Sequence, residues 1–299
     1  NLSDVSTITN KVRNYDYERF KWDLNNYIKL PYISNKKSLI NNNNSNKNLH
    51  FIIGIITFKR VTYLKNLINL MIKTLSSDYF FTIIISKGLD LLESEHVELE
   101  EFLINSFKKF DNINLIINYS YLHYNYHTCN SILKLSENIE YDFGFILNDD
   151  ILVYDDWYIK YYNSSKANNI EHLCWLQDKE TTIIDKNKNL KHKGDVFNAN
   201  GVLLTFTKNL IKNVGFFNET DFKVRGQSHI EWSLRCCNKG YNNKTTFYDI
   251  LDSNQLVKLN TKNYSSAISH TPYFDKVIHF VDKYELEKRN RLLNKIYNK

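Results

Sequence analysis

From residue 49 onward, short apolar runs alternate with amphipathic segments. The first run is HFIIGIIT (residues 50–57), and three similar runs occupy residues 79–86, 113–119 and 141–147. A run that is apolar at almost every position is typical of a parallel strand covered on both faces. The four runs therefore predict the strands of a parallel sheet.

The segments between these runs carry helical periodicity. Residues 63–75, YLKNLINLMIKTL, repeat apolar side chains at helical spacing. A second segment has an apolar face that runs from Leu99 to Phe110, with Glu residues in its early turns, where a helix N-terminus favours negative charge. A third helix is expected over residues 127–136. This order of strands and helices predicts an α/β fold, an open sheet with helices on both faces.

The two ends of the chain differ from this middle region. Residues 1–48 are polar and end in the tract NNNNSNKN, which has no apolar face and cannot repay the entropy of ordering. We expect an N-terminal polar segment with an Asn-rich linker, then one packed domain over residues 49–270 and a helical extension over residues 271–299. The chain begins with Asn, which leaves room for further domains of a longer protein.

Charge and hydropathy exclude some classes of function. The net charge of +6 over 299 residues is spread along the chain, which favours anionic ligands such as nucleotide phosphates and not nucleic acid. The longest apolar runs are far shorter than the roughly 18 residues of a membrane span, so at most a peripheral membrane association is expected. The four cysteines match no zinc motif, and we expect reduced thiols in a cytoplasmic protein.

The fourth apolar run ends in FILNDD, an amide and two adjacent carboxylates at residues 148–150. Two adjacent carboxylates repel each other unless a cation, a donor or water satisfies them. In open α/β sheets the ligand sits beyond the carboxyl ends of the strands, and Mg²⁺ or Mn²⁺ usually takes one or two carboxylates plus substrate phosphates. The motif predicts a site for Mn²⁺ or Mg²⁺; the alternative is a solvated turn.

Two other stretches offer chemistry of the same kind. TFKR, residues 57–60, places a hydroxyl and two cations after the first strand, where they would suit the base and phosphates of a nucleotide. The alternative for these residues is an ordinary charged surface. In the turn NANG, which ends at Gly201, small residues would let a ligand approach the backbone closely, although the turn fits a hairpin or crossover equally well.

The stretch GQSHIEWSLRCCNKGY, residues 226–241, is an amphipathic helix with a stop at Gly240. His229 and Glu231 at its start, with Trp232 beside them, are candidates for acid/base chemistry and for stacking on a sugar. The alternative is a capped helix with a Trp in the core.

Taken in this order, the stretches resemble the glycosyltransferase 2 type of GT-A sugar transferase. TFKR stands where that family has a TFNR-like turn, and NDD stands where it has a DxD metal motif. Residues 215–241, GFFNETDFKVRGQSHIEWSLRCCNKGY, match the pattern GxFDE…F…G.ED.DWS.R…GY. The resemblance covers about residues 50–250 and implies a GT-A fold with an open mixed sheet for the catalytic domain.

The resemblance also implies an activity. It is the metal-dependent, inverting transfer of a sugar from a nucleotide-diphosphate sugar, with UDP as the expected nucleotide, to an acceptor hydroxyl. The acceptor would be a glycan or a protein-linked group, as in glycan or surface polysaccharide synthesis. The sequence departs from the family pattern at two places: Asn148 replaces the first Asp of the DxD motif, and Ser228–His229 replaces the Glu–Asp pair. A catalytically degenerate module that binds a nucleotide or a glycan is therefore an alternative. A nucleotidyltransferase would share the sheet and the metal, but not the EWS.R segment.

Site residues follow from the resemblance position by position. The nucleotide is expected to contact Thr57, Phe58, Arg60, Ser86, Asn148 and Asp149. The sugar or the acceptor is expected to contact Trp232, Gly201, Asn200 and Trp175. The metal is expected to bind Asp150, with Asp149 close by and His270 as a late ligand.

The acceptor hydroxyl needs a general base, for which the helix start offers two candidates. The imidazole of His229 has an ordinary pKa near 6.5, which suits a base at neutral pH, whereas a carboxyl near 4.3 needs help from burial. Inverting transferases of this type are nevertheless expected to use a carboxylate. We therefore expect Glu231 to be the base and His229 to orient the acceptor or the phosphates, with the reverse assignment as the alternative.

Overall fold

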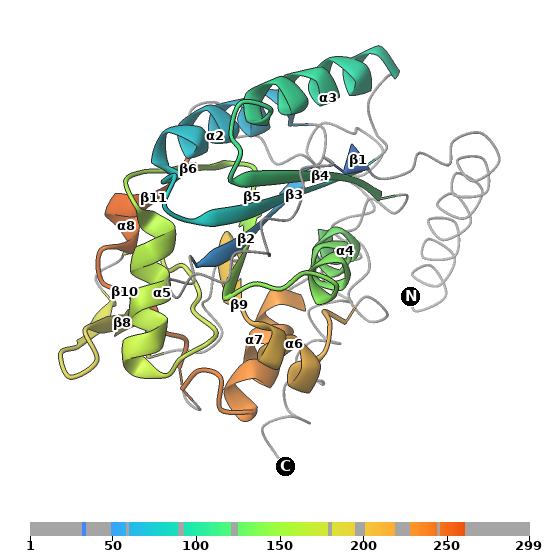
Figure 1. Ribbon diagram of the computed structural model, residues 1–299. Coiled ribbons are helices and arrows are strands. Elements are labelled where there is room, and N and C mark those ends of the chain that lie inside the picture. Colours follow the sequence, from blue (N-terminus) through green and yellow to red (C-terminus); the bar gives the residue numbers. More distant parts are fainter. Residues whose placement is uncertain are drawn as a thin grey trace, which may run out of the picture.

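A computed structural model (Figure 1) describes residues 32–33, 49–57, 60–88, 93–120, 125–178, 181–194, 201–218, 228–243 and 246–260. Its centre is a mixed six-stranded sheet with the strand order β1-β4-β3-β2-β5-β9. The strands β2 to β5 are parallel, and the two edge strands β1 and β9 are antiparallel to their neighbours. Their bounds are Tyr32–Ile33 (β1), His50–Thr57 (β2), Phe80–Gly88 (β3), Ile113–Ser120 (β4), Phe143–Asn148 (β5) and Leu203–Phe206 (β9).

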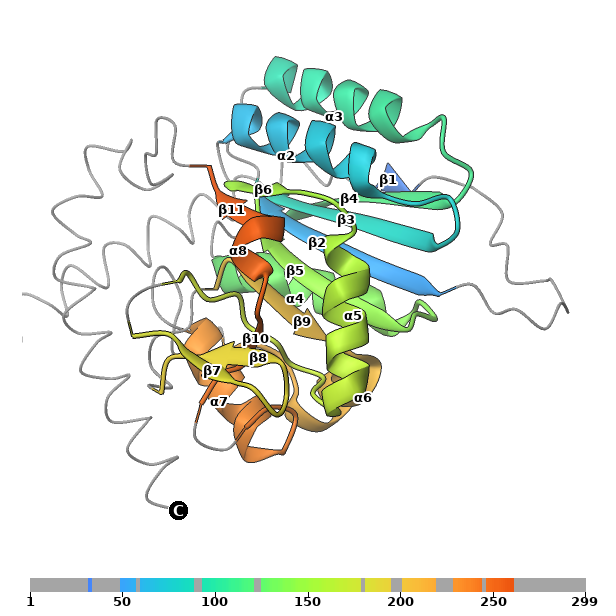
Figure 2. The same ribbon diagram turned by 90° about the vertical axis from the view of Figure 1, so that its left-hand side faces the viewer.

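Helices cover both faces of this sheet (Figure 2). Helices α2 and α3 lie on one face, while α4, α6 and α7 lie on the other (Figures 1 and 2). Each apolar run and each amphipathic segment predicted from the sequence corresponds to one of these elements, so the predicted open α/β sheet is confirmed. The helices span Val61–Thr74 (α2), Glu93–Phe107 (α3), Asn125–Glu137 (α4), Trp157–Asn168 (α5), Lys208–Val214 (α6) and Ser228–Asn238 (α7).

Strand β2 shows why the sheet needs helices on both sides. Successive side chains of a strand point to opposite faces. Phe51 and Ile53 pack with α2, α3 and α5 in one apolar core, whereas Ile52 and Ile56 pack with α4, α6 and α7 in a second core. All four side chains are buried, which is why the run reads as continuously apolar.

Gly54 allows α4 to lie close against β2. A Cβ at this position would come within 2.3 Å of Cγ2 of Ile132, a residue of α4 that has no exposed surface. The close approach fixes the height of α4 above the sheet, and α4 borders the site described below.

Smaller elements complete the carboxyl side of the chain. A two-stranded sheet pairs β6 (Ile151–Val153) with β11 (Val257–Leu259), and the backbone N–H of Asn260 donates to the carbonyl of Asp150 at 2.8 Å. This pairing fixes the segment that follows β5. The remaining elements are β7 (Ile183–Asp185), β8 (Leu190–His192), β10 (Asp249–Ile250) and the short helix α8 (Ser253–Leu256).

The ends of the domain are only partly described. Tyr32 and Ile33 form β1 and pair with β4, so the sheet includes two residues of the segment that the sequence assigned to the polar N-terminus. The expected helical extension over residues 271–299 lies outside the described residues. Among the helices that the structure describes, none is both long enough and apolar enough to cross a membrane.

Candidate functional site

The carboxyl ends of two adjacent parallel strands bring the predicted motifs together. β2 ends at Thr57 and β5 ends at Asn148, and Ile56 is the register partner of Asn148. Arg60 immediately precedes α2, and Asp149 and Asp150 form the turn after β5. Stretches about ninety residues apart in the chain therefore meet at one edge of the sheet, as the sequence predicted.

Arg60 and Thr57 satisfy the two adjacent carboxylates. Nη1 of Arg60 donates to Oδ2 of Asp150 at 2.7 Å, and Nη2 of the same guanidinium contacts Oδ1 of Asp149. The Thr57 hydroxyl donates to Oδ2 of Asp149 at 2.7 Å. The side chains of Arg60, Asp149 and Asp150 are only 18%, 0% and 6% exposed, so little solvent screens these contacts. We call Thr57, Arg60, Asp149 and Asp150 the acidic cluster.

The charge state of Asp149 reflects opposing influences. Burial raises the pKa of its carboxyl to about 7, while Arg60 and the hydrogen bond from Thr57 act in the opposite direction. The side chain of Asp149 therefore depends on Arg60 to stay ionised at neutral pH. In this structure the Asp149 side chain has no exposed surface and its two oxygens face Thr57 and Arg60, so its expected contact with a metal stays a prediction.

Two oxygens at or beside the acidic cluster lack a hydrogen-bond partner. Among the described residues, Oδ1 of Asn148 and Oδ1 of Asp150 are buried and accept no hydrogen bond. One carboxylate oxygen and one amide oxygen, completed by phosphate and water, suit Mg²⁺ or Mn²⁺. No group of three or more His, Cys, Asp or Glu side chains within the described ranges could hold a metal alone, and His270 lies outside them. The residues thus fit a cation that is shared with a bound phosphate group.

Helix α7 separates the two candidate bases. Successive residues of an α-helix are about 100° apart around the axis, so residues two apart diverge. Glu231 turns toward Arg235, whose Nε and Nη2 donate to its two carboxylate oxygens at 2.6 and 3.0 Å. The same guanidinium donates to the carbonyls of Val214 and Phe216.

Glu231 thus holds Arg235, which connects α7 to the end of α6 at Val214 and to Phe216 just beyond it. Glu231 is 6% exposed and Arg235 donates to both of its oxygens, an arrangement that does not favour a base, and its expected role as the base stays a prediction. His229 of the same helix lines a pocket. The spacing of four between Glu231 and Arg235 was the available sequence signal, since such pairs face each other on a helix.

Both tryptophans expected to contact the sugar belong to the core instead. Trp232 has no exposed surface, stacks on Phe217 with ring centroids 4.5 Å apart, and donates from Nε1 to the carbonyl of Gly215. Trp175 is 2% exposed and donates from Nε1 to the carbonyl of Val257. Both indoles are packed in the core, so the structure does not favour the predicted sugar contacts of Trp232 and Trp175, which stay predictions.

Three other predicted residues need separate mention. Ser86 lies within β3, has no exposed surface and accepts from Asn118, so this structure does not place it in contact with a nucleotide. Phe58 and Asn200 lie outside the described residues.

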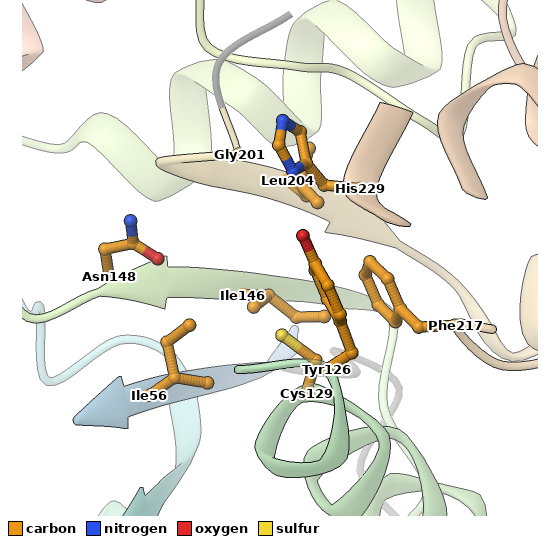
Figure 3. Close-up of a pocket in the computed structure, with 9 residues that line it drawn as sticks. All are labelled: Ile56, Tyr126, Cys129, Ile146, Asn148, Gly201, Leu204, Phe217 and His229. Carbon is orange, nitrogen blue, oxygen red and sulfur yellow. The ribbon is translucent and has the colours of Figure 1, made fainter. Parts of the chain in front are cut away.

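A pocket of about 130 Å³ lies beside the acidic cluster, between β2, β5, β9, α4 and α7. In Figure 3 the ring of His229 and the amide of Asn148 border this pocket, and the hydroxyl of Tyr126 points toward His229. Gly201 belongs to the same wall, where a Cβ would come within 2.8 Å of Cγ of His229. The lining residues are Ile56, Tyr126, Cys129, Ile146, Asn148, Gly201, Leu204, Phe217 and His229.

The sequence analysis missed Tyr126 and Cys129. Both are in the first half of α4, the helix that follows β4 in the chain. The loop after a parallel strand leads from the ligand-binding edge of the sheet, which was the signal that could have pointed to them.

Comparison with known proteins bears on the fold. No family model matches the chain. The chain is 27% identical over 177 residues to an uncharacterised glycosyltransferase of Acanthamoeba polyphaga mimivirus, and the match covers 56% of this chain and 62% of that protein. The chain thus spans less than two thirds of the length of this relative.

Two solved structures are similar in fold. GalNAc-T7 in complex with UDP, GalNAc and Mn²⁺ matches with a TM-score of 0.51 and 11% identity, over 68% of this chain and 43% of that chain. S. aureus TarS in complex with UDP-GlcNAc matches with a TM-score of 0.47 and 12% identity, over 84% and 72%. The chain has the GT-A fold of nucleotide-sugar transferases, so the resemblance stated from the sequence is confirmed in the fold.

Proposed function

We propose that this chain is a glycosyltransferase that moves a sugar from a nucleotide-diphosphate sugar to an acceptor hydroxyl. The observation that carries the proposal is the acidic cluster at the carboxyl edge of β2 and β5, with the pocket that contains His229 beside it. In open α/β sheets this edge is where ligands bind. The GT-A fold and the relative named a glycosyltransferase support the same conclusion.

The donor would lie with its diphosphate at the acidic cluster and its sugar at the pocket. Oδ1 of Asp150 and Oδ1 of Asn148 would hold a Mn²⁺ or Mg²⁺ ion shared with the diphosphate. Such an ion would neutralise the charge that develops on the diphosphate as it leaves. Because GalNAc-T7 was solved with UDP and Mn²⁺, we propose UDP as the nucleotide and Mn²⁺ as the first cation to test.

His229 is our proposed general base. Its ring nitrogen would take the proton of the acceptor hydroxyl while that oxygen forms a bond to the anomeric carbon of the sugar. The bond from the anomeric carbon to the diphosphate breaks in the same step, and its electron pair stays on the diphosphate. A single displacement of this kind inverts the anomeric centre.

A binding module without turnover is the second candidate. One observation favours this candidate. Glu231 is the acidic residue at the family position, and Arg235 donates to both of its carboxylate oxygens. In that case the pocket would recognise a nucleotide sugar or a glycan and release it unchanged. The two candidates predict the same binding and differ only in chemistry.

Binding and turnover should therefore be measured separately on the 299-residue chain. Titration calorimetry with UDP, GDP and ADP in Mn²⁺ tests the nucleotide site, and we expect UDP to bind most tightly. Release of UDP from UDP-sugars, with water or a glycan panel as acceptor, tests the transfer. Binding without release would favour the binding module, and no binding of any nucleoside diphosphate at millimolar concentration would overturn both candidates.

A further inference from the structure

The β7–β8 hairpin exposes two large apolar side chains that are neighbours in the chain. Ile183 and Ile184, both in β7, are 50% and 56% exposed. Among the large apolar side chains that the structure describes, only Val97 of α3 is comparably exposed. Single exposed apolar residues are ordinary on a protein surface, whereas a contiguous apolar surface marks a candidate site of contact with a partner.

The hairpin holds these side chains in place. β8 pairs with β10, where Leu190 is the register partner of Ile250, and Leu190 has no exposed surface. The Tyr248 hydroxyl donates to Oδ2 of Asp185, the residue after Ile184, at 2.8 Å. The two exposed isoleucines therefore belong to a strand that is anchored to the domain.

β7 is the edge strand of its sheet. Within the part of the chain that the structure describes it pairs only with β8, and Figures 1 and 2 show the hairpin at the periphery of the molecule, away from the central sheet. Adjacent residues of a strand point to opposite faces, so Ile183 and Ile184 offer apolar surface on both faces of the hairpin. A groove on another protein would cover one face, whereas the headgroup region of a bilayer surrounds an inserted hairpin and leaves water to satisfy its edge.

The charge of the hairpin complements an anionic bilayer. Residues 181–194 contain four lysines and one aspartate, a net charge of +3. Lys191 is paired with Asp178 at 2.6 Å. Lys186 is exposed and Lys188 is partly exposed, and both follow the isoleucines in the turn of the hairpin. Lysines beside exposed apolar side chains are the combination that favours the surface of an anionic membrane.

We propose that the β7–β8 hairpin docks the protein on the surface of a bilayer that contains anionic lipid. Ile183 and Ile184 enter the headgroup region, and Lys186 and Lys188 contact the lipid phosphates and carboxylates. Because only two apolar side chains and two lysines take part, the association is peripheral and reversible. It does not depend on the proposed transferase chemistry, and the experiments below leave that proposal untouched.

Sedimentation of the 299-residue chain with lipid vesicles tests the inference. The vesicles contain phosphatidylcholine with or without phosphatidylserine, at low and at high salt. We expect binding about tenfold tighter with phosphatidylserine than without it, and a loss of this advantage at high salt. The double variant Ile183→Ser/Ile184→Ser should bind the anionic vesicles about tenfold more weakly, because it removes the apolar surface that enters the bilayer.

Control variants remove the same groups elsewhere on the molecule. Val97→Ser removes an apolar side chain that is 47% exposed and should leave vesicle binding unchanged. Lys186→Gln/Lys188→Gln should remove the advantage of phosphatidylserine, whereas Lys108→Gln/Lys109→Gln, at two exposed positions just beyond α3, should retain it. Full binding by the hairpin variants, or an equal loss in the control variants, would overturn the inference.

A fluorescent reporter on the hairpin supplies a readout that does not rely on loss of binding. Ile184→Trp places an indole on β7, whereas Trp157, Trp175 and Trp232 are buried. In the difference spectrum against wild type we expect a blue shift with anionic vesicles and quenching by brominated lipid. Circular dichroism checks the fold of each variant, and an unchanged emission of folded Ile184→Trp would overturn the inference even if the serine variant failed to fold.

A second copy of the chain is another occupant that an exposed edge strand can accept. Sedimentation velocity without lipid separates this case from membrane docking. We expect wild type and Ile183→Ser/Ile184→Ser to have the same oligomeric state. A dimer that is present in wild type and lost in the variant would assign the isoleucines to an interface between copies and overturn the proposal.

Discussion

The guanidinium of Arg60 contacts the carboxylates of both Asp149 and Asp150, and so joins the residue before α2 to the turn that follows β5. The contact explains how the protein accommodates two adjacent carboxylates that would otherwise repel each other. It also means that the charge of the acidic cluster is partly neutralised by the protein before any ligand binds. The roles of the Arg60 guanidinium and of a bound metal ion can be tested separately.

Replacing Arg60 with Met should destabilise the fold, because the buried Asp149 carboxyl would lose its cation and have to take up a proton at neutral pH. Removing one partner of a buried ion pair costs roughly 3–5 kcal/mol; Arg60 is 18% exposed, so we expect about 2–3 kcal/mol. Urea unfolding at pH 7 measures the change in the free energy of unfolding. Lys65→Met, which breaks an exposed pair with Glu98, is the matched control and should leave stability unchanged; an equal effect of both variants would contradict the role of Arg60.

Asp150 should carry the effect of a divalent cation on nucleotide binding. We expect Mn²⁺ to raise the affinity of the wild-type chain for UDP by about tenfold over the affinity in EDTA, since Asp150 supplies the carboxylate oxygen that is left without a hydrogen bond. In Asp150→Asn the affinity in EDTA should persist and the gain from Mn²⁺ should disappear. Calorimetry under the two conditions checks this, and a full Mn²⁺ effect in the variant would rule out Asp150 as a ligand.

Substitution of His229 should lower turnover, whereas substitution of Glu231 should mainly lower stability. His229→Asn should lower kcat by about 10²–10⁴-fold, the usual range for loss of a general base, and leave the affinity for UDP unchanged. Glu231→Gln should mainly lower stability, by about 1–3 kcal/mol, because Arg235 loses a charged acceptor. The pH profile of kcat and urea unfolding of each variant separate these roles, and near-normal turnover in His229→Asn together with its loss in folded Glu231→Gln would restore the assignment expected from the sequence.

His172 should make stability depend on pH. Burial lowers the pKa of this imidazole to about 4, from an ordinary value of 6.5, and its two ring nitrogens are hydrogen-bonded to the Thr205 carbonyl and the Ser233 hydroxyl. Between pH 6.5 and pH 4 the unfolded chain binds more protons at this residue than the folded chain does. The free energy of unfolding should therefore fall as the pH falls through this window.

The size of the effect follows from the shift in pKa. From pH 7 to pH 5 the advantage of wild type over His172→Asn should shrink by about 2 kcal/mol. Asp249 acts with the opposite sign, because burial raises the pKa of its carboxyl to about 6, but its contribution cancels in the difference between the two proteins. Urea unfolding of both at pH 7, 6 and 5 measures that difference, and a constant difference would contradict the buried neutral state of His172.

The sequence predicted β2, β3, β4 and β5 well because each of these strands is a nearly continuous apolar run. It also placed the TFKR and NDD stretches at the ends of strands, and the carboxyl ends of parallel strands lie on the same edge of the sheet. The partner of each charged group was not predictable in the same way. Arg60 could have pointed into solvent, and its contact with both carboxylates depends on the pairing of β2 with β5.

Helix α7 also has features that could not be predicted from the sequence. The residues EWS.R matched a family pattern, but whether the face of α7 that carries Glu231 and Arg235 turns toward a ligand or toward the segment around the end of α6 depends on the rotation of the helix. Trp232 is apolar enough for a core and flat enough for a sugar, and only the position of Phe217 decides between these roles. The pocket residues Tyr126 and Cys129 carry no motif and are recognised only when α4 is placed beside β5.

The position of β2 at the centre of the sheet has a consequence for the order of folding. β2 pairs with β3 across one helical crossover, whereas Thr57 and Asp149 are 92 residues apart in the chain. Closing the longer loop costs more entropy, so the unit from β2 to β4 is expected to form before β5 docks. A nucleotide that needs both sides of the acidic cluster can then bind only after the slow pairing is complete, and it should slow unfolding without accelerating folding.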